Sequence, residues 1–161
     1  MAALPNVVQY DEGHPDLVRN ARYLEAALRL RGVEAEVRAL EGAPPIVLGA
    51  LDVPGAERTI GIYVHYDGQP VDEPRWSTPP WQPRLFDAPP STGAVPLEWP
   101  DRGEAIDGEW RLYGRATADD KAPIVALLSA LDALGRVGDA SCLSALLEIA
   151  LDDDADLAQA A

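Results

Sequence analysis

Residues 59–67, Thr59-Ile60-Gly61-Ile62-Tyr63-Val64-His65-Tyr66-Asp67, combine an apolar run with polar side chains at its end. A short run of branched and aromatic residues is typical of a strand that is buried on both faces. We therefore expect residues 58–66 to form an inner strand of a sheet that helices cover on both sides. The carboxyl end of this strand would carry His65 and Asp67.

The flanking sequence predicts further helices and strands around this run. Apolar residues recur at helical spacing over 15–31, and Gly32 stands where a helix C-cap is expected. Branched residues bounded by Gly and Pro predict strands over 33–40 and 45–53. A second helix is expected over 121–134. The predicted fold class is α/β, with helices packed on a mixed β-sheet.

The stretch 68–109 shows neither the helical nor the strand period of apolar residues, and it is rich in Pro, Gly and acidic residues. Four tryptophans lie in it or directly after it: Trp76, Trp81, Trp99 and Trp110. Disordered linkers are usually poor in large apolar groups, so we expect a long ordered loop with one short hairpin. Long ordered loops inside a domain are commonly functional.

Composition narrows the class of protein. The chain has 161 residues, enough for one ordinary domain, and a formal net charge of −14 that would repel nucleic acid. It shows neither a secretory signal nor an apolar run of membrane-spanning length, which predicts a cytoplasmic protein without membrane contact. A single cysteine, Cys142, excludes a multi-thiolate zinc site, so a metal would bind histidine and carboxylates.

Two constellations carry candidate chemistry. In His65-Tyr66-Asp67, a neutral imidazole could bind a metal while a carboxylate fixes its tautomer, or the histidine could simply be satisfied at a strand end. In Asp119-Asp120-Lys121, an aspartate could bind a metal or only cap the helix that follows. Ligand sites of α/β sheets collect beyond the carboxyl ends of strands, where both segments would emerge.

Several motifs in one order resemble the M20 family of metallopeptidases. They are His65-Tyr66-Asp67-Gly68-Gln69-Pro70, then Trp76 with Pro79-Pro80-Trp81-Gln82-Pro83, then Leu112-Tyr113-Gly114-Arg115-Ala116-Thr117-Ala118-Asp119-Asp120-Lys121-Ala122-Pro123. The resemblance is to dipeptidase-like and carnosinase-like members and covers roughly residues 14–136. It implies an M20 catalytic-domain-like fold.

The resemblance also implies a metal site and a reaction. His65 would ligate one zinc ion, Asp67 would orient His65, and Asp119 would bridge two zinc ions, with manganese or cobalt as possible replacements. Two such ions polarise an amide carbonyl and activate water, so the implied substrates are small peptides or acylated amino acids. The polar atoms of His65 and Asp119 should then converge, with Asp67 facing the ring of His65.

The chain also departs from the family. It has no Glu-Glu pair, which supplies the family's general base and a metal ligand, and it ends before the remaining ligands and the dimerisation domain. We therefore expect a fragment that is inactive alone and whose oligomeric state stays open. Asp153 and Asp154 lie about where the pair would stand, but aspartate is one methylene shorter than glutamate.

The C-terminal part favours a different structure. Apolar residues over 143–150 recur at helical spacing, and together with 131–139 they resemble one HEAT-like repeat, with Asp153 and Asp154 in a solvated turn. We divide the chain into a partial zinc-hydrolase domain over 1–137 and a helical tail over 138–161. The alternative function is a non-catalytic protein-interaction module, built on an M20 relic with this tail.

Overall fold

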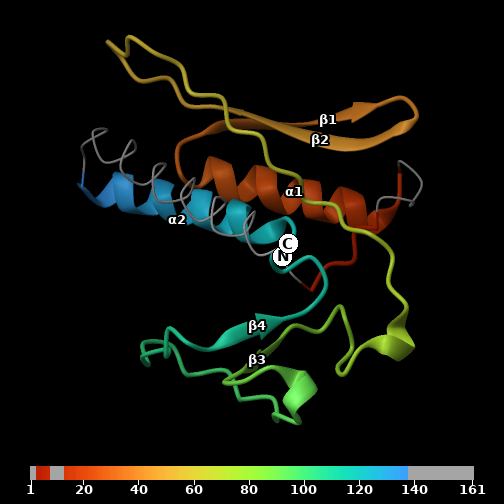
Figure 1. Ribbon diagram of the computed structural model, residues 1–161. Coiled ribbons are helices and arrows are strands. Elements are labelled where there is room, and N and C mark those ends of the chain that lie inside the picture. The colour runs from red at the N-terminus through yellow and green to blue at the C-terminus, as the bar shows by residue number, and fades with distance from the viewer. Residues whose placement is uncertain (1–2, 8–12, 138–161) are drawn as a thin grey trace.

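The computed structural model describes residues 3–7 and 13–137. Its elements, in chain order, are α1 (Pro15–Arg29), β1 (Glu34–Leu40), β2 (Ala43–Ala50), the 3-10 helix η1 (Glu73–Arg75), β3 (Arg84–Phe86), the 3-10 helix η2 (Pro90–Thr92), β4 (Arg111–Tyr113) and α2 (Lys121–Val137). The two long helices lie side by side, with the β1–β2 hairpin on one side of them and β3 with β4 on the other (Figure 1).

Local sequence sets the limits of α1. The ring of His14 accepts a hydrogen bond from the backbone N–H of Asp16 at 3.3 Å, and Pro15 occupies the first helical position, where its missing N–H leaves no bond unmade. The chain leaves the helix through Gly32, whose φ of +82° suits glycine. The helix predicted over 15–31 is confirmed to within two residues.

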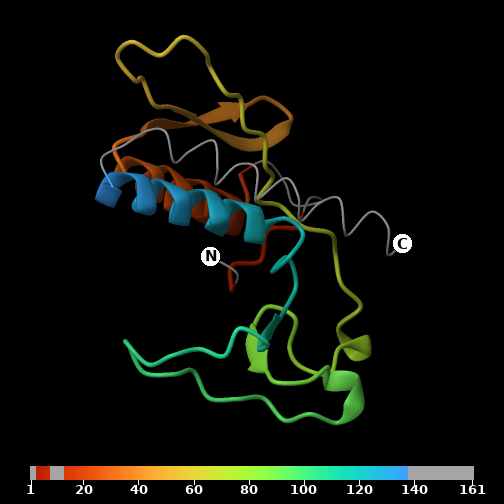
Figure 2. The same ribbon diagram turned by 60° about the vertical axis from the view of Figure 1, so that its left-hand side comes forward.

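The strands predicted over 33–40 and 45–53 are confirmed as a hairpin. β1 and β2 pair antiparallel with Val37 opposite Val47, and the register shifts between Arg38 and Leu40 near the turn. Gly42, with a φ of +73°, makes this turn. The hairpin packs over α1, as both views show (Figure 2).

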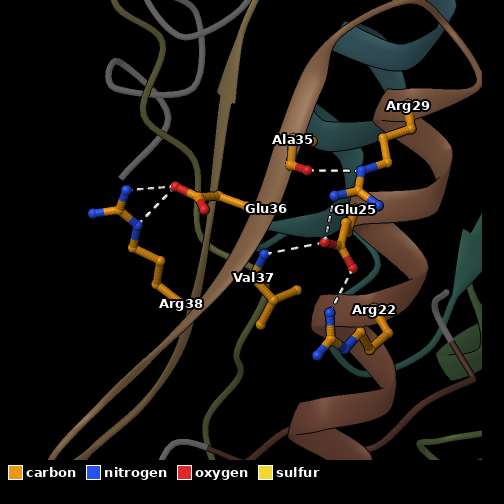
Figure 3. Close-up of polar contacts among 7 residues, drawn as sticks. All are labelled: Arg22, Glu25, Arg29, Ala35, Glu36, Val37 and Arg38. Atoms are coloured by element: carbon orange, nitrogen blue, oxygen red, sulfur yellow. Dashed lines mark hydrogen bonds and ion pairs between the residues drawn. The ribbon is translucent and has the colours of Figure 1, made fainter.

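Glu25 ties α1 to β1. Its carboxylate accepts bonds from Arg22 Nη1 at 2.8 Å and from the backbone N–H of Val37 at 3.3 Å, and it pairs with Arg29 Nη2 at 3.1 Å (Figure 3). Arg29 also donates to the carbonyl of Ala35 at 2.7 Å. The hydrogen bond from Arg22, followed by the charge of Arg29, holds the pKa of Glu25 below its usual value against the opposing effect of burial.

This network predicts acid sensitivity. A carboxylate whose folded-state pKa is lowered stabilises the fold fully above its unfolded value of 4.5, and this contribution is lost as the pH falls through the lower folded value. We expect Glu25→Gln to lower the thermal midpoint at pH 7 and to lower it less at pH 3. Glu36→Gln is the control, because among the described residues the Glu36 carboxylate bonds only Arg38, which lies within β1 (Figure 3). Equal losses at both pH values would contradict the assignment.

The core lies between the two helices. Leu24 and Ala27 of α1 pack against Ile124 and Leu128 of α2, all at most 9% exposed. Four half-buried side chains close this cluster: Leu28, Val47, Val64 and Tyr66. The helix predicted over 121–134 is confirmed as α2 and runs three residues further.

The inner strand predicted over 58–66 is wrong. The described residues form two separate two-stranded antiparallel sheets, and 58–66 belongs to neither. Ile60 and Ile62 are 53% and 46% exposed, so this run is not buried on both faces. A strand needs neighbours for its backbone N–H and C=O groups, and none of the described strands pairs with this segment. The α/β class holds, while the mixed sheet does not.

The long stretch after residue 67 contains β3, but its partner strand β4 lies just beyond the stretch 68–109 in which a short hairpin was expected. β3 pairs antiparallel with β4, and Leu97 adds a bridge to Leu85. Phe86, 1% exposed, meets the ring of Tyr113 edge-on at a centroid distance of 5.4 Å. This unit leads the chain from β4 into the turn before α2.

None of the helices in the described part of the chain has the length and apolar character needed to cross a membrane. The predicted tail over 138–161, with Asp153 and Asp154, lies outside the described residues.

Candidate metal centre

The turn between β4 and α2 carries the acidic pair and is fixed by its own backbone. The backbone N–H of Arg115 donates to the carbonyl of Pro80 at 2.7 Å, and that of Lys121 donates to the carbonyl of Ala116 at 3.3 Å. Ala116 itself is buried and has a φ of 59°. The peptide bond between Asp119 and Asp120 is cis.

Gly114 is the first residue of this turn, and its backbone lies close to Pro83. A Cβ at position 114 would stand 3.1–3.2 Å from three carbons of Pro83, which is rigid and partly backbone. We expect Gly114→Ala to destabilise the chain by about 1 kcal/mol, because the overpacking exceeds the entropic gain of removing a glycine. Gly108→Ala is the control, since nothing lies within 4 Å of its Cβ. Urea denaturation measures both variants, and equal midpoints would contradict the close approach.

The segment that begins at Val64 forms the other side of the site, facing the turn between β4 and α2. Val64 and Tyr66 anchor this segment in the core, and the Tyr66 hydroxyl donates to the carbonyl of Pro45. Burial, with the nearby charge of Asp67, raises the pKa of Tyr66 to about 12. Gly68 donates its N–H to the carbonyl of Asn6 at 2.8 Å. These anchors turn His65 and Asp67 toward the acidic turn.

The side chains of the two segments meet at His65. Its Nδ1 lies 3.1 Å from Oδ1 of Asp67, and its Nε2 lies 3.4 Å from Oδ1 of Asp119 and 3.8 Å from Oδ2 of Asp120. The His65 side chain is 39% exposed and that of Asp119 is 72% exposed, so solvent reaches the space between them. The expected convergence of His65 and Asp119, with Asp67 facing the ring, is confirmed.

The neighbours of the His65 ring determine its tautomer. Nδ1 is close to two acceptors of Asp67, the carboxylate oxygen and the backbone carbonyl at 3.2 Å, so in the neutral ring Nδ1 carries the hydrogen. Nε2 then presents a lone pair toward the carboxylate of Asp119. A lone pair and a carboxylate repel each other unless a proton or a cation lies between them.

The distance between Nε2 of His65 and Oδ1 of Asp119 is compatible with a cation between them. A charge-assisted N–H···O bond is about 2.7–2.9 Å long, well below the 3.4 Å seen here. Two donors bound about 2.1 Å from one tetrahedral zinc ion would stand about 3.4 Å apart. His65 and Asp119 therefore fit a shared zinc ion by donor type and by separation. Within residues 3–7 and 13–137, however, no group of three or more His, Cys, Asp or Glu side chains is arranged to hold a metal.

Asp120 and Lys121 form hydrogen bonds that connect the segments around the site. Oδ2 of Asp120 accepts the backbone N–H of His65 at 3.0 Å, which ties the two segments together directly. Lys121 is 1% exposed and donates from Nζ to the carbonyl of Leu4 at 2.9 Å. Burial, with the nearby charge of Arg115, lowers the pKa of Lys121 to about 8. The motif had placed both residues beside the site without showing these bonds.

The N-terminal segment also contacts the site region, which the sequence had not indicated. Val7 forms a parallel bridge with Gly68, and Leu4 and Asn6 accept hydrogen bonds from the site region. These bonds use backbone carbonyls, which every residue has. No sequence signal marks such partners.

Comparison with known proteins relates the chain to metallopeptidases. It is 31% identical over 96 residues to Cys-Gly metallodipeptidase dug1 of Schizosaccharomyces pombe, a match that covers 59% of this chain and 16% of the relative. It is 28% identical over 149 residues to Cys-Gly metallodipeptidase DUG1 of Candida albicans, covering 84% of this chain and 27% of the relative. The matches thus span between 16% and 27% of the relatives' lengths. No protein-family profile and no solved structure matches the chain.

Proposed function

We propose that this chain is part of a zinc-dependent amidohydrolase of the M20 type, which hydrolyses the amide bonds of small peptides or acylated amino acids. His65 and Asp119 would be zinc ligands, and Asp67 would orient His65. The observation that carries the proposal is the approach of His65 Nε2 to Oδ1 of Asp119 at 3.4 Å, with Asp67 at Nδ1 of the same ring. The similarity to Cys-Gly metallodipeptidases supports it from the sequence side.

Each residue of the proposed metal site would have a separate role. Asp67 holds the hydrogen on Nδ1 of His65 and leaves Nε2 free to bind zinc. Asp119, exposed and with two hard oxygens, would hold zinc from the other side and could bridge to a second ion. Asp120 fixes the backbone of His65, which keeps the ring in place. Bound zinc would supply Lewis-acid polarisation of the amide and an acidified water.

The 161 residues alone would be inactive. Catalytic zinc sites usually provide three protein ligands per metal, and the proposed set is His65 and Asp119. None of the described residues is placed as a general base, whose loss commonly costs about 10²- to 10⁴-fold in rate. We propose residues 1–137 as the partial catalytic domain and a cytoplasmic location without nucleic-acid partners; the tail over 138–161 stays a prediction.

Zinc titration of the purified chain by calorimetry tests the proposal, followed by assays of Cys-Gly hydrolysis with zinc, manganese or cobalt. We expect weak zinc binding and no turnover. The complete absence of zinc binding would refute the metal site. Tight binding of two zinc ions, with turnover that His65→Ala and Asp119→Ala abolish, would refute the view that the chain is inactive alone.

A further inference from the structure

We propose that a cavity beside the candidate metal centre, formed around Arg75 and Arg115, binds the terminal carboxylate of a peptide substrate. This inference rests on the proposed function and adds to it the chemical group that the enzyme would recognise.

The cavity is open and has a volume of about 390 Å³. Its lining combines two guanidinium groups with one carboxylate and three less polar side chains: Pro70, Val71, Asp72, Arg75, Trp76 and Arg115. The volume lies within the range of small-molecule sites, about 300–1,000 Å³. Such sites usually combine apolar walls with a few polar groups that fix the ligand's orientation.

Arg75 and Arg115 belong to the arginines without an ion pair among the described residues, and they are distinguished from the others by lining one cavity together. With 27 Asp and Glu against 13 Lys and Arg, most basic side chains should find a carboxylate nearby. Within the described ranges, six arginines do form ion pairs with Asp or Glu: Arg19, Arg22, Arg29, Arg31, Arg38 and Arg111. Arg75 and Arg115 have no such pair among these residues, although both line the same cavity.

Arg115 is held in place and is not a freely moving surface side chain. Its Nε donates to the carbonyl of Gln69 at 3.0 Å, and its own backbone N–H donates to Pro80. The guanidinium passes close to Gly68, where a Cβ would stand 3.9 Å from Cζ and from Nη2. A positioned guanidinium loses little conformational freedom when it binds a planar carboxylate.

The residues that line the cavity begin at Pro70, shortly after His65 and Asp67 in the chain. Asp67 faces the ring of His65, Gly68 and Gln69 contact Arg115, and Pro70 already lines the cavity. In the complex that we propose, the amide of a dipeptide lies near His65 and its carboxylate lies between the two arginines. A free carboxylate matches the planar donor array of guanidinium groups, whereas an uncharged amide would leave both charges unpaired.

The negative charge of Asp72 opposes the attraction between the arginines and a bound carboxylate. Replacing Asp72 should therefore change carboxylate affinity in the opposite direction to replacing an arginine. The Asp72 carboxylate shares the cavity with both arginines, so it weakens the pull on any anion. Asp72→Asn should strengthen carboxylate binding, and Arg75→Gln should weaken it. Arg75 is the better of the two arginines to replace, because its side chain has no hydrogen bond to any residue that the structure describes.

The experiment uses the whole 161-residue chain with a metal chelator present, so that its result does not depend on the zinc site. N-acetylglycine and N-acetylglycinamide are titrated while the indole N–H resonance of Trp76, assigned with Trp76→Phe, is followed by NMR. We expect N-acetylglycine to shift this resonance and the amide not to. Arg75→Gln should weaken binding roughly tenfold, as for a lost bond to a charged group, and Asp72→Asn should tighten it.

Arg58→Gln is the matched control, since Arg58 is exposed, also has no ion pair among the described residues and lies outside the cavity. It should leave binding unchanged. Equal binding of the two acetylated probes, tighter binding of inorganic phosphate, or an unchanged affinity in Arg75→Gln would each overturn the carboxylate site. Because zinc is absent, none of these results bears on the proposed metal site. A failed zinc titration would likewise leave the cavity result standing.

Discussion

Replacing His65 with alanine is expected to weaken zinc binding to this chain by at least about 100-fold. Removing a group that only orients a metal-binding histidine commonly costs about 10- to 100-fold in affinity, and losing a ligand itself should cost no less. Since the proposed set within the chain is His65 and Asp119, the remaining carboxylate would bind zinc no better than the acidic surface does. Calorimetry with the wild-type chain and the variant measures the difference.

Two further variants separate the roles in this site. Asp67→Asn should weaken zinc binding by about 10- to 100-fold, because the amide no longer favours a hydrogen on Nδ1 of His65 by its charge. His14→Ala replaces the other histidine of the chain, at the start of α1, and should leave zinc affinity unchanged. If the His65 and His14 variants bind zinc equally well, the ligand assignment fails.

Replacing Phe86 with alanine is expected to lower the free energy of unfolding by about 3–4 kcal/mol. Phe86 is 1% exposed, and deleting a buried aromatic ring removes both its transfer free energy and its contacts with neighbours such as Tyr113. Because marginal domains have only about 5–15 kcal/mol in total, this single change should shift the unfolding midpoint strongly. Urea denaturation followed by tryptophan fluorescence measures it.

Val95→Ala is the control for this prediction. Val95 lies in the same long stretch between β3 and β4 but is 74% exposed, so its loss should change stability by less than about 0.5 kcal/mol. A loss in Phe86→Ala no larger than that in Val95→Ala would mean that residues 68–113 do not fold around this ring.

Much of the local structure could be predicted from the sequence. The limits of α1 and α2 followed from helical spacing, and the β1–β2 hairpin followed from branched runs divided by Gly42. The run 58–66 was misjudged because its composition shows only that it suits a strand. Whether a strand forms depends on neighbours that accept its backbone hydrogen bonds, and composition does not specify them.

The candidate site was also predicted from the sequence only in part. The motifs pointed to His65, Asp67 and Asp119, and the structure brings all three together although the sheet expected to carry them is absent from the described residues. The sequence did not reveal the bond from His65 to Asp120, the contact of Lys121 with Leu4, or the cavity around the arginines. These features join segments that are distant along the chain.

By itself, then, the sequence determined the helices, the first hairpin and the residues with metal-binding chemistry, since each depends on side chains within a few positions of one another. Only the tertiary structure decided which ring nitrogen of His65 faces Asp119, and that Arg75 and Arg115, which have no ion pair among the described residues, line one cavity. Both depend on distances across the fold, which arise from the packing of α1 against α2 and of β3 against β4. Periodicity along a chain carries no measure of such distances.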